Sequence, residues 1–168
     1  MSRADACWLA HVNIARLQLP LADPHMHDLT KAIDRINALA ETSHGFVWRL
    51  PGDETTRDAL SLFSSYVIGF DVERFFLTLS VWDTIADLHA FVYHSEHLKF
   101  LRLARRWTEP LGRPHVALWW LPRGHLPTIA DSRDRLMNVF DRGASTQAFT
   151  FQTTFLPSDR LAAEPGRQ

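Results

Sequence analysis

One stretch of the chain, residues 75–107, joins an apolar segment directly to the densest group of aromatic, imidazole and guanidinium side chains. Its sequence is FFLTLSVWDTIADLHAFVYHSEHLKFLRLARRW. Residues 75–82 form a continuous run of mostly aromatic, aliphatic and β-branched residues, which is typical of a buried strand. Thr84, with Asp87 three residues later, resembles a helix capping box, and Ser95 resembles the cap of a second helix. The stretch therefore predicts a strand followed by two helices, and it indicates where a ligand would bind.

Hydrophobic spacing elsewhere predicts further strands and helices. Asp23 followed by Pro24 predicts the start of a long amphipathic helix. Thr128 predicts the cap of a later helix that ends at Gly143. The segment 51–74 mixes turn residues with a short apolar patch, so we expect a long, mobile excursion there. The expected strands are residues 8–15, 46–50, 75–82, 115–121 and 148–154, and the expected helices are residues 24–43, 85–94, 96–109 and 129–142.

The order of the first six expected elements, β-α-β-β-α-β, matches a ferredoxin-like fold of the α+β class. In that fold an antiparallel sheet carries helices on one face. Apolar residues occur on both sides of the expected strands, so the second face should also be buried. We expect a second copy of the chain to cover it, which predicts a homodimer. We also expect a single domain over residues 1–156 and a disordered tail over residues 157–168.

Composition narrows the classes of partner. The formal net charge of −1 gives no general attraction to phosphate groups, which argues against nucleic acid as a partner. No run of about 18 apolar residues occurs, so we expect neither a membrane span nor a signal peptide. Cys7 is the single cysteine, which excludes an intramolecular disulfide and suits the cytoplasm. Six tryptophans, eleven phenylalanines and nine histidines indicate either a very aromatic core or an aromatic-lined pocket.

Short motifs are distributed along residues 8–155. They are NIAR at 13–16, GFVWRL at 45–50, VW at 81–82, FVYHSEH at 91–97, RRW at 105–107, LWWLPRGHLPT at 118–128 and AFTF at 148–151. With these motifs the chain resembles the bacterial DUF3291 proteins, members of the dimeric α/β-barrel superfamily that also holds the antibiotic-biosynthesis monooxygenases. The resemblance implies the fold, a homodimer and a pocket between sheet and helices in each subunit. It implies no particular reaction, because proteins of one fold differ widely in chemistry.

His97 is the first candidate catalytic residue, as a general acid or base, because imidazole titrates near neutrality. Tyr93, four residues earlier, is a second candidate. The alternative for His97 is a hydrogen bond to a backbone carbonyl that only fixes the helix break. His94 and His97 have a spacing that can serve a metal, but no acidic or cysteine ligand stands at a motif distance, so we predict no metal site. Haem with His97 as axial ligand is left open, because some relatives by fold bind haem through a histidine; otherwise we predict no cofactor.

Arg49 is the third candidate catalytic residue. Alternation along the expected strand places Arg49 on the same sheet face as Val47, where a guanidinium needs an anionic partner. That partner is either an acidic or phenolic ligand or a carboxylate such as Glu73 or Glu109. Further polar groups on the otherwise apolar strands are His11, Asn13, Thr78, Ser80 and Gln152.

The expected pocket is lined largely by tryptophans, for which packing in the core is the alternative role. The candidate ligand-binding residues are Asn13, Trp48, Trp82, Arg102, Trp107, Trp120 and His125. We therefore expect a monooxygenase-like enzyme that acts on an apolar, aromatic or polyketide-like metabolite. The alternatives are a non-catalytic protein that binds a hydrophobic ligand, and a haem-binding enzyme with an axial histidine.

Overall fold

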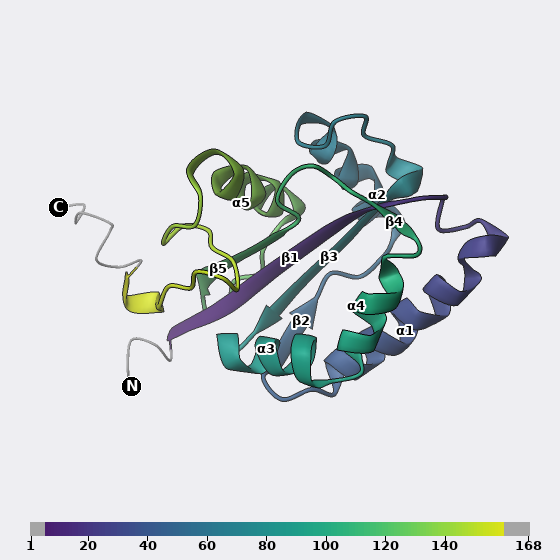
Figure 1. Cartoon of the computed structure of the whole chain (residues 1–168). Coiled ribbons are helices and arrows are strands. Elements are labelled where there is room, and N and C mark those ends of the chain that lie inside the picture. Colours follow the sequence, from purple (N-terminus) through teal and green to yellow (C-terminus); the bar gives the residue numbers. More distant parts are fainter. Residues whose placement is uncertain (1–5, 160–168) are drawn as a thin grey trace.

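The computed structural model describes residues 6–159 of the 168-residue chain. Its strands are β1 (Cys7–Leu17), β2 (Phe46–Arg49), β3 (Phe75–Trp82), β4 (Thr108–Glu109) and β5 (Val116–Pro122). They form one five-stranded antiparallel sheet with β1 in the middle (Figure 1). β3 and then β2 lie on one side of β1, while β4 and β5 pair with different parts of its other edge. The ferredoxin-like antiparallel sheet predicted from the sequence is thereby confirmed.

The helices begin where the sequence provides capping groups. They are η2 (Pro24–Met26), α1 (His27–Glu41), α2 (Glu54–Ala59), η3 (Leu60–Ser65), η4 (Val72–Arg74), α3 (Ile85–His94), α4 (His97–Ala104) and α5 (Ile129–Arg142). Asp23 caps η2, which leads directly into α1. The hydroxyl of Thr84 accepts a hydrogen bond from the backbone N–H of Asp87 at the start of α3. Thr128 and Asp131 form a complete capping box at α5.

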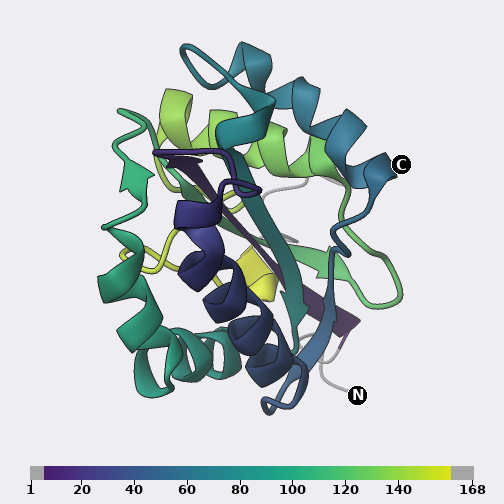
Figure 2. The same cartoon turned by 90° about the vertical axis from the view of Figure 1, so that its right-hand side faces the viewer.

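One face of the sheet is covered by α1, α3 and α4 (Figure 2). Side chains alternate along β1, so that Leu9, His11 and Asn13 point to this face. Leu9 packs with Trp82 of β3 and Leu88 of α3 in a buried cluster at one end. A second cluster, at the other end, brings residues of α1 and α4 together over β3. The space between the two clusters is the site described below.

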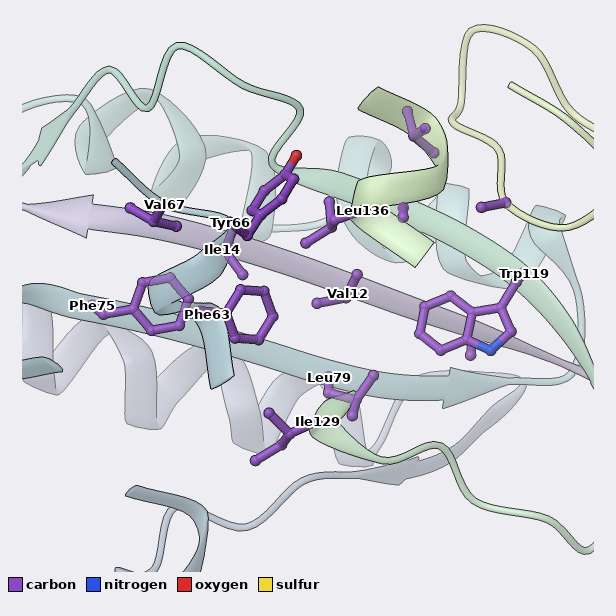
Figure 3. Close-up of a cluster of buried hydrophobic side chains, with 14 of the residues drawn as sticks. Val12, Ile14, Phe63, Tyr66, Val67, Phe75, Leu79, Trp119, Ile129 and Leu136 are labelled. Atoms are coloured by element: carbon purple, nitrogen blue, oxygen red, sulfur yellow. The ribbon is translucent and has the colours of Figure 1, made fainter. Parts of the chain in front are cut away.

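The second face of the sheet is covered by the chain itself. Val12 and Ile14 of β1 pack in one buried cluster with Leu136 of α5 and with Phe63 and Tyr66 from the segment 51–74 (Figure 3). The prediction that this segment is a mobile excursion is therefore wrong, because its apolar side chains belong to the core. The prediction that a second copy covers this face is wrong for the same reason.

Two further elements differ from the sequence prediction. The helix expected to reach residue 109 ends at Ala104, and a turn then leads into β4, which takes backbone hydrogen bonds from the end of β1. The strand expected at residues 148–154 is reduced to isolated bridges, because the chain folds back on itself after Phe149 has paired with Leu118. Pro157, at the start of the expected tail, is buried, and residues 160–168 lie outside the described residues.

Candidate functional site

A cavity of about 600 Å³ lies between the sheet and the three helices α1, α3 and α4. Residues of β1 and β3 form its floor, aromatic residues of α3 and α4 contribute one wall, and α1 contributes another. A volume of this size accommodates a small organic molecule. Because the second face of the sheet is filled by the chain's own core, this cavity belongs to the helix-covered face alone.

The floor is polar because β1 and β3 present polar residues to each other. Their antiparallel register pairs His11 with Ser80 and Asn13 with Thr78. Ser80 Oγ accepts a hydrogen bond from Trp82 Nε1 at 3.0 Å and lies 3.4 Å from His11 Nδ1. Thr78 Oγ1 donates to the backbone carbonyl of Asn13 at 3.5 Å. Among residues 6–159 the side-chain amide of Asn13 has no hydrogen-bond partner, so it is available to a ligand.

His97 lies on the cavity wall at the break between α3 and α4. Ser95 ends α3 in an extended conformation, and its hydroxyl accepts a hydrogen bond from the backbone N–H of His97 at 3.1 Å. Nδ1 of His97 lies 3.4 Å from the carbonyl oxygen of Val92. Since a carbonyl only accepts, Nδ1 carries the proton of the neutral ring and Nε2 keeps its lone pair. His97 thus makes the hydrogen bond to a backbone carbonyl that was one of its two expected roles. Its Nε2 lone pair is the group that the other role, general base, would use.

Aromatic side chains give the cavity flat apolar walls. The Trp82 ring stacks on Phe91, with centroids 5.0 Å apart, and Phe91 in turn lies 4.7 Å from the His97 ring. Phe151, from the segment after α5, lies 6.2 Å from His11 and 5.5 Å from Tyr93. Tyr93 is 38% exposed, so it lies at the rim rather than in the interior. The walls therefore favour a ligand with a planar aromatic body.

Desolvation keeps the imidazoles of the cavity uncharged, although His11 and His97 are half-buried and His115 is exposed. Desolvation, helped by the nearby His97, lowers the pKa of His11 from 6.5 to about 3. Desolvation also lowers the pKa of His97, against the opposing effect of its hydrogen bond to Val92, and lowers the pKa of His115. All three rings are therefore neutral at physiological pH. A neutral imidazole with a free lone pair, such as that of His97, can accept a proton from a ligand.

A β-bulge brings Arg49 to the cavity. The register pairs Phe46 with Trp82 and Arg49 with Ser80, and it shifts between Phe46 and Trp48. Simple alternation would put Phe46 and Arg49 on opposite faces, whereas the register shift places Arg49 on the helix-covered face together with Phe46. Bulges commonly redirect a side chain in this way beside functional sites.

The anionic partner of Arg49 is a carboxylate of α1. Nε of Arg49 donates to Oε1 of Glu41 at 2.6 Å. The carboxylates suggested by the sequence are engaged elsewhere, Glu73 with Arg57 and Glu109 with Arg74. Arg49 therefore enters the cavity wall as one half of an ion pair, which leaves a weaker field for an anionic ligand.

The structure brings half of the predicted site residues to the cavity. His97, Arg49, Tyr93, Asn13 and Trp82 line it. The others lie elsewhere: Trp48 packs against the core of the second face, Trp107 packs against the cluster between α1 and α4, Trp120 donates Nε1 to the carbonyl of Phe155 at 2.7 Å, and Arg102 and His125 are exposed.

The α1 wall was missed by the sequence analysis. Thr30, Asp34 and Asn37 line the cavity at helical spacings of four and three, next to the apolar Ile33. A polar stripe of this kind is normally a solvated helix face, so its spacing alone gave no reason to place it in a pocket. His11 and Ser80 were expected as polar groups on the strands but were not included in the predicted site.

The lining fits a neutral ligand better than a metal or haem. Among residues 6–159 no group of three or more potential metal ligands occurs. His97 is the imidazole in the lining that could hold a haem iron, but haem also carries two anionic propionates. The guanidinium of Arg49 is already paired with Glu41, and Asp34 adds a further carboxylate to the lining, so the cavity offers these propionates little. An absorption spectrum of protein expressed with adequate iron tests this directly, and we expect no Soret band.

Comparison with solved structures finds distant likenesses. A cofactor-independent oxygenase from Streptomyces nogalater, SnoaB, is 14% identical, with a TM-score of 0.46 over 73% of this chain and 100% of that one. A Pseudomonas aeruginosa protein, PA3566, is 16% identical, with a TM-score of 0.42 over 74% of this chain and 100% of that one. A Nitrosomonas europaea protein of unknown function is 12% identical, with a TM-score of 0.43 over 74% of this chain and 98% of that one. Likenesses at this level carry no statement about reaction or ligand.

The family of the chain is identified by its sequence rather than by a solved structure. None of the curated proteins matches the chain. Within residues 6–159, every helix is too short or too polar to cross a membrane. The family model described as "Domain of unknown function (DUF3291)" matches residues 8–164. Since that match spans nearly the whole sequence, the chain belongs to the DUF3291 family.

Proposed function

We propose that the protein is a monooxygenase-like enzyme that acts on a neutral aromatic metabolite in the cavity, with His97 as general base. The observation that carries this proposal is the state of His97: a half-buried neutral imidazole whose Nδ1–H is bonded to Val92 and whose Nε2 has no hydrogen-bond partner among residues 6–159, on an aromatic-lined wall. Asn13 on the floor and Arg49 at the wall supply polar groups that orient the ligand. Tyr93 lies at the rim, where it adds a further aromatic contact.

Such an oxygenase needs no cofactor if the substrate anion is itself electron-rich. Nε2 of His97 would take a proton from a methylene carbon that is conjugated through aromatic rings with a carbonyl group, and the resulting anion would pass an electron to O2. Combination of the two radicals forms a C–O bond, the peroxide takes up the proton from His97, and loss of water leaves a new carbonyl. One molecule of substrate and one of O2 thus give one molecule of ketone or quinone and one of water.

A non-catalytic binding protein is the competing function, because the same cavity could hold a hydrophobic metabolite without changing it. The two functions differ in what they require of His97. A binder needs only the shape of the ring, whereas the oxygenase needs its lone pair. Replacement of this residue therefore separates them.

We predict that His97→Gln lowers turnover of anthrone, a neutral tricyclic aromatic ketone, by about 100-fold or more while its dissociation constant changes by less than about threefold. Anthrone binding is measured by calorimetry, and turnover is measured as oxygen uptake together with the anthraquinone formed. His94→Gln is the matched control, because His94 is exposed and lies three residues away, outside the lining. Binding by the wild type with no oxygen uptake would favour the binding protein, and equal turnover of His97→Gln and wild type would remove His97 from the mechanism.

A homodimer and a cytoplasmic location stay proposals. The homodimer now rests on the resemblance alone, since the second face of the sheet is already covered by α5 and η3. Light scattering on the purified protein decides between a mass of 19.3 kDa and twice that value.

A further inference from the structure

The hydroxyl of Ser80 determines which nitrogen of His11 carries the proton. Ser80 Oγ already accepts the N–H of Trp82 at 3.0 Å. Among the described residues, the one acceptor within reach of the Ser80 O–H is His11 Nδ1, at 3.4 Å. If Nδ1 carried the proton instead, the Ser80 hydroxyl would lose its acceptor in a part-buried position, which is costly. The chain of bonds therefore runs from Trp82 through Ser80 to His11, and it leaves the proton of His11 on Nε2.

His11 and His97 consequently have complementary roles, one as a hydrogen-bond donor and the other as a proton acceptor. Both rings line the cavity, and they lie close enough for a charge on one to oppose a charge on the other. His97 is held with a lone pair on Nε2, whereas His11 is held with an N–H on Nε2. Desolvation and the nearby His97 lower the pKa of His11 to about 3, so His11 stays a neutral donor near neutral pH.

The cross-strand row that contains His11 also contains the guanidinium of Arg49, which is paired with Glu41. Pairing across the sheet places Arg49 of β2 beside Ser80 of β3, and Ser80 beside His11 of β1 (Figure 1 shows the three strands side by side). A negative charge that develops on a ligand near His11 therefore lies on the side of the cavity that carries the guanidinium. Asp34 belongs to the α1 wall and not to this row.

We propose that His11 is a second catalytic residue, which donates its Nε2–H to the carbonyl oxygen of the ligand while His97 removes a proton from the methylene carbon that is conjugated with that carbonyl through the aromatic rings. The ligand class is therefore an enolisable aromatic ketone, and the protein has an oxygen-independent activity, the exchange of that carbon-bound proton with solvent. This inference rests on the proposed function, because it assigns the roles of two residues at the same site. A neutral imidazole that donates to a developing enolate is an established device for such chemistry.

The exchange step is balanced without any further reactant. The C–H bond breaks, its electron pair moves to the carbonyl oxygen as an enolate, and the proton goes to His97 Nε2. His11 strengthens its hydrogen bond to that oxygen as the charge forms. The proton on His97 exchanges with solvent, and return of a solvent proton to carbon restores the ketone.

The test follows anthrone in deuterium oxide without oxygen, with loss of the methylene proton signal measured by NMR. We expect the wild type to accelerate exchange, and we expect His11→Phe to lower that acceleration by about 100-fold while anthrone binding changes by less than about threefold. His97→Gln should also abolish most of the acceleration. His94→Phe, the same substitution at an exposed site outside the lining, should leave it unchanged.

A second readout is independent of activity. In the free protein, nitrogen NMR of the His11 ring should show an unprotonated Nδ1 and a protonated Nε2, and Ser80→Ala should shift the ring toward the other tautomer. Failure of the wild type to bind anthrone would overturn the proposed function together with this inference. Binding followed by exchange that His11→Phe leaves intact, or a proton found on Nδ1, would overturn the role of His11 while the proposed function stands.

Discussion

Phe63→Ala is expected to lower the free energy of unfolding by about 3–5 kcal/mol, as measured by urea denaturation. Phe63 lies in η3 and is fully buried against the second face of the sheet. Its ring is 5.0 Å from that of Phe75 and 6.4 Å from that of Tyr66. Removal of the ring leaves a cavity in the largest core cluster, and η3 cannot collapse into it without also moving Tyr66, whose hydroxyl donates to the carbonyl of Pro114 at 2.7 Å.

The neighbouring residue supplies the control. Leu62 is 39% exposed, so Leu62→Ala should cost less than about 1 kcal/mol in the same measurement. If both substitutions had equally small effects, the segment 51–74 would be a surface excursion and the second face of the sheet would be open to another molecule. A large difference between them establishes that the chain covers this face itself.

The parts of the fold that follow local rules could be predicted from the sequence. The alternation along β1 gives its bounds to within two residues, and the bounds of β3 agree at both ends. Thr84 and Thr128 mark helix starts because a cap depends only on a few neighbouring residues. The ferredoxin-like order follows from these elements without any knowledge of tertiary contacts.

The covering of the second face could not be predicted in the same way. Phe63, Tyr66 and Val67 are spaced as one short helical face, but they stand among turn-forming residues, and such a short apolar group is equally compatible with a surface patch. Whether it is buried depends on α5, which is distant in the sequence. A similar limit applies to residues 148–154, where β propensity is outweighed by a turn that ends the pairing after Phe149.

The site residues also fall into those that depend on local sequence and those that depend on contacts between distant segments. His97 could be identified because its neighbours in the sequence, Ser95 among them, create the helix break that positions it. The role of His11 depends on its partner across the sheet, Ser80. The register between two strands that are distant in the sequence cannot be predicted from the residues of either strand alone. Arg49 was recognised as unusual, but the bulge that directs it, and Glu41 as its partner, became visible only in the three-dimensional arrangement.

Acid is expected to destabilise the wild type more than His11→Phe. The pKa of His11 is 6.5 when the chain is unfolded and about 3 in the folded protein, because burial and the nearby His97 disfavour the charged ring. Between these two values the unfolded chain binds more protons, so the free energy of unfolding falls as the pH falls below 6.5. Each pH unit corresponds to about 1.4 kcal/mol for one such group. Because the ring borders the cavity, where water lowers the penalty, we expect a total near 2 kcal/mol at pH 4.5.

Comparison of the two proteins isolates the contribution of His11 from that of the other titrating groups. His97 and His115 also have lowered pKa values, and they weaken both proteins in acid. The quantity to measure is therefore the stability difference between His11→Phe and wild type, by urea denaturation from pH 7.5 to pH 4.5. Between pH 7.5 and pH 4.5 the free energy of unfolding of His11→Phe should rise by about 2 kcal/mol relative to that of the wild type. The difference between His94→Phe and the wild type should show no such trend. A difference that stays constant with pH would mean that His11 is solvated and chargeable in the folded protein, and it could not then serve as the neutral donor at the floor of the cavity.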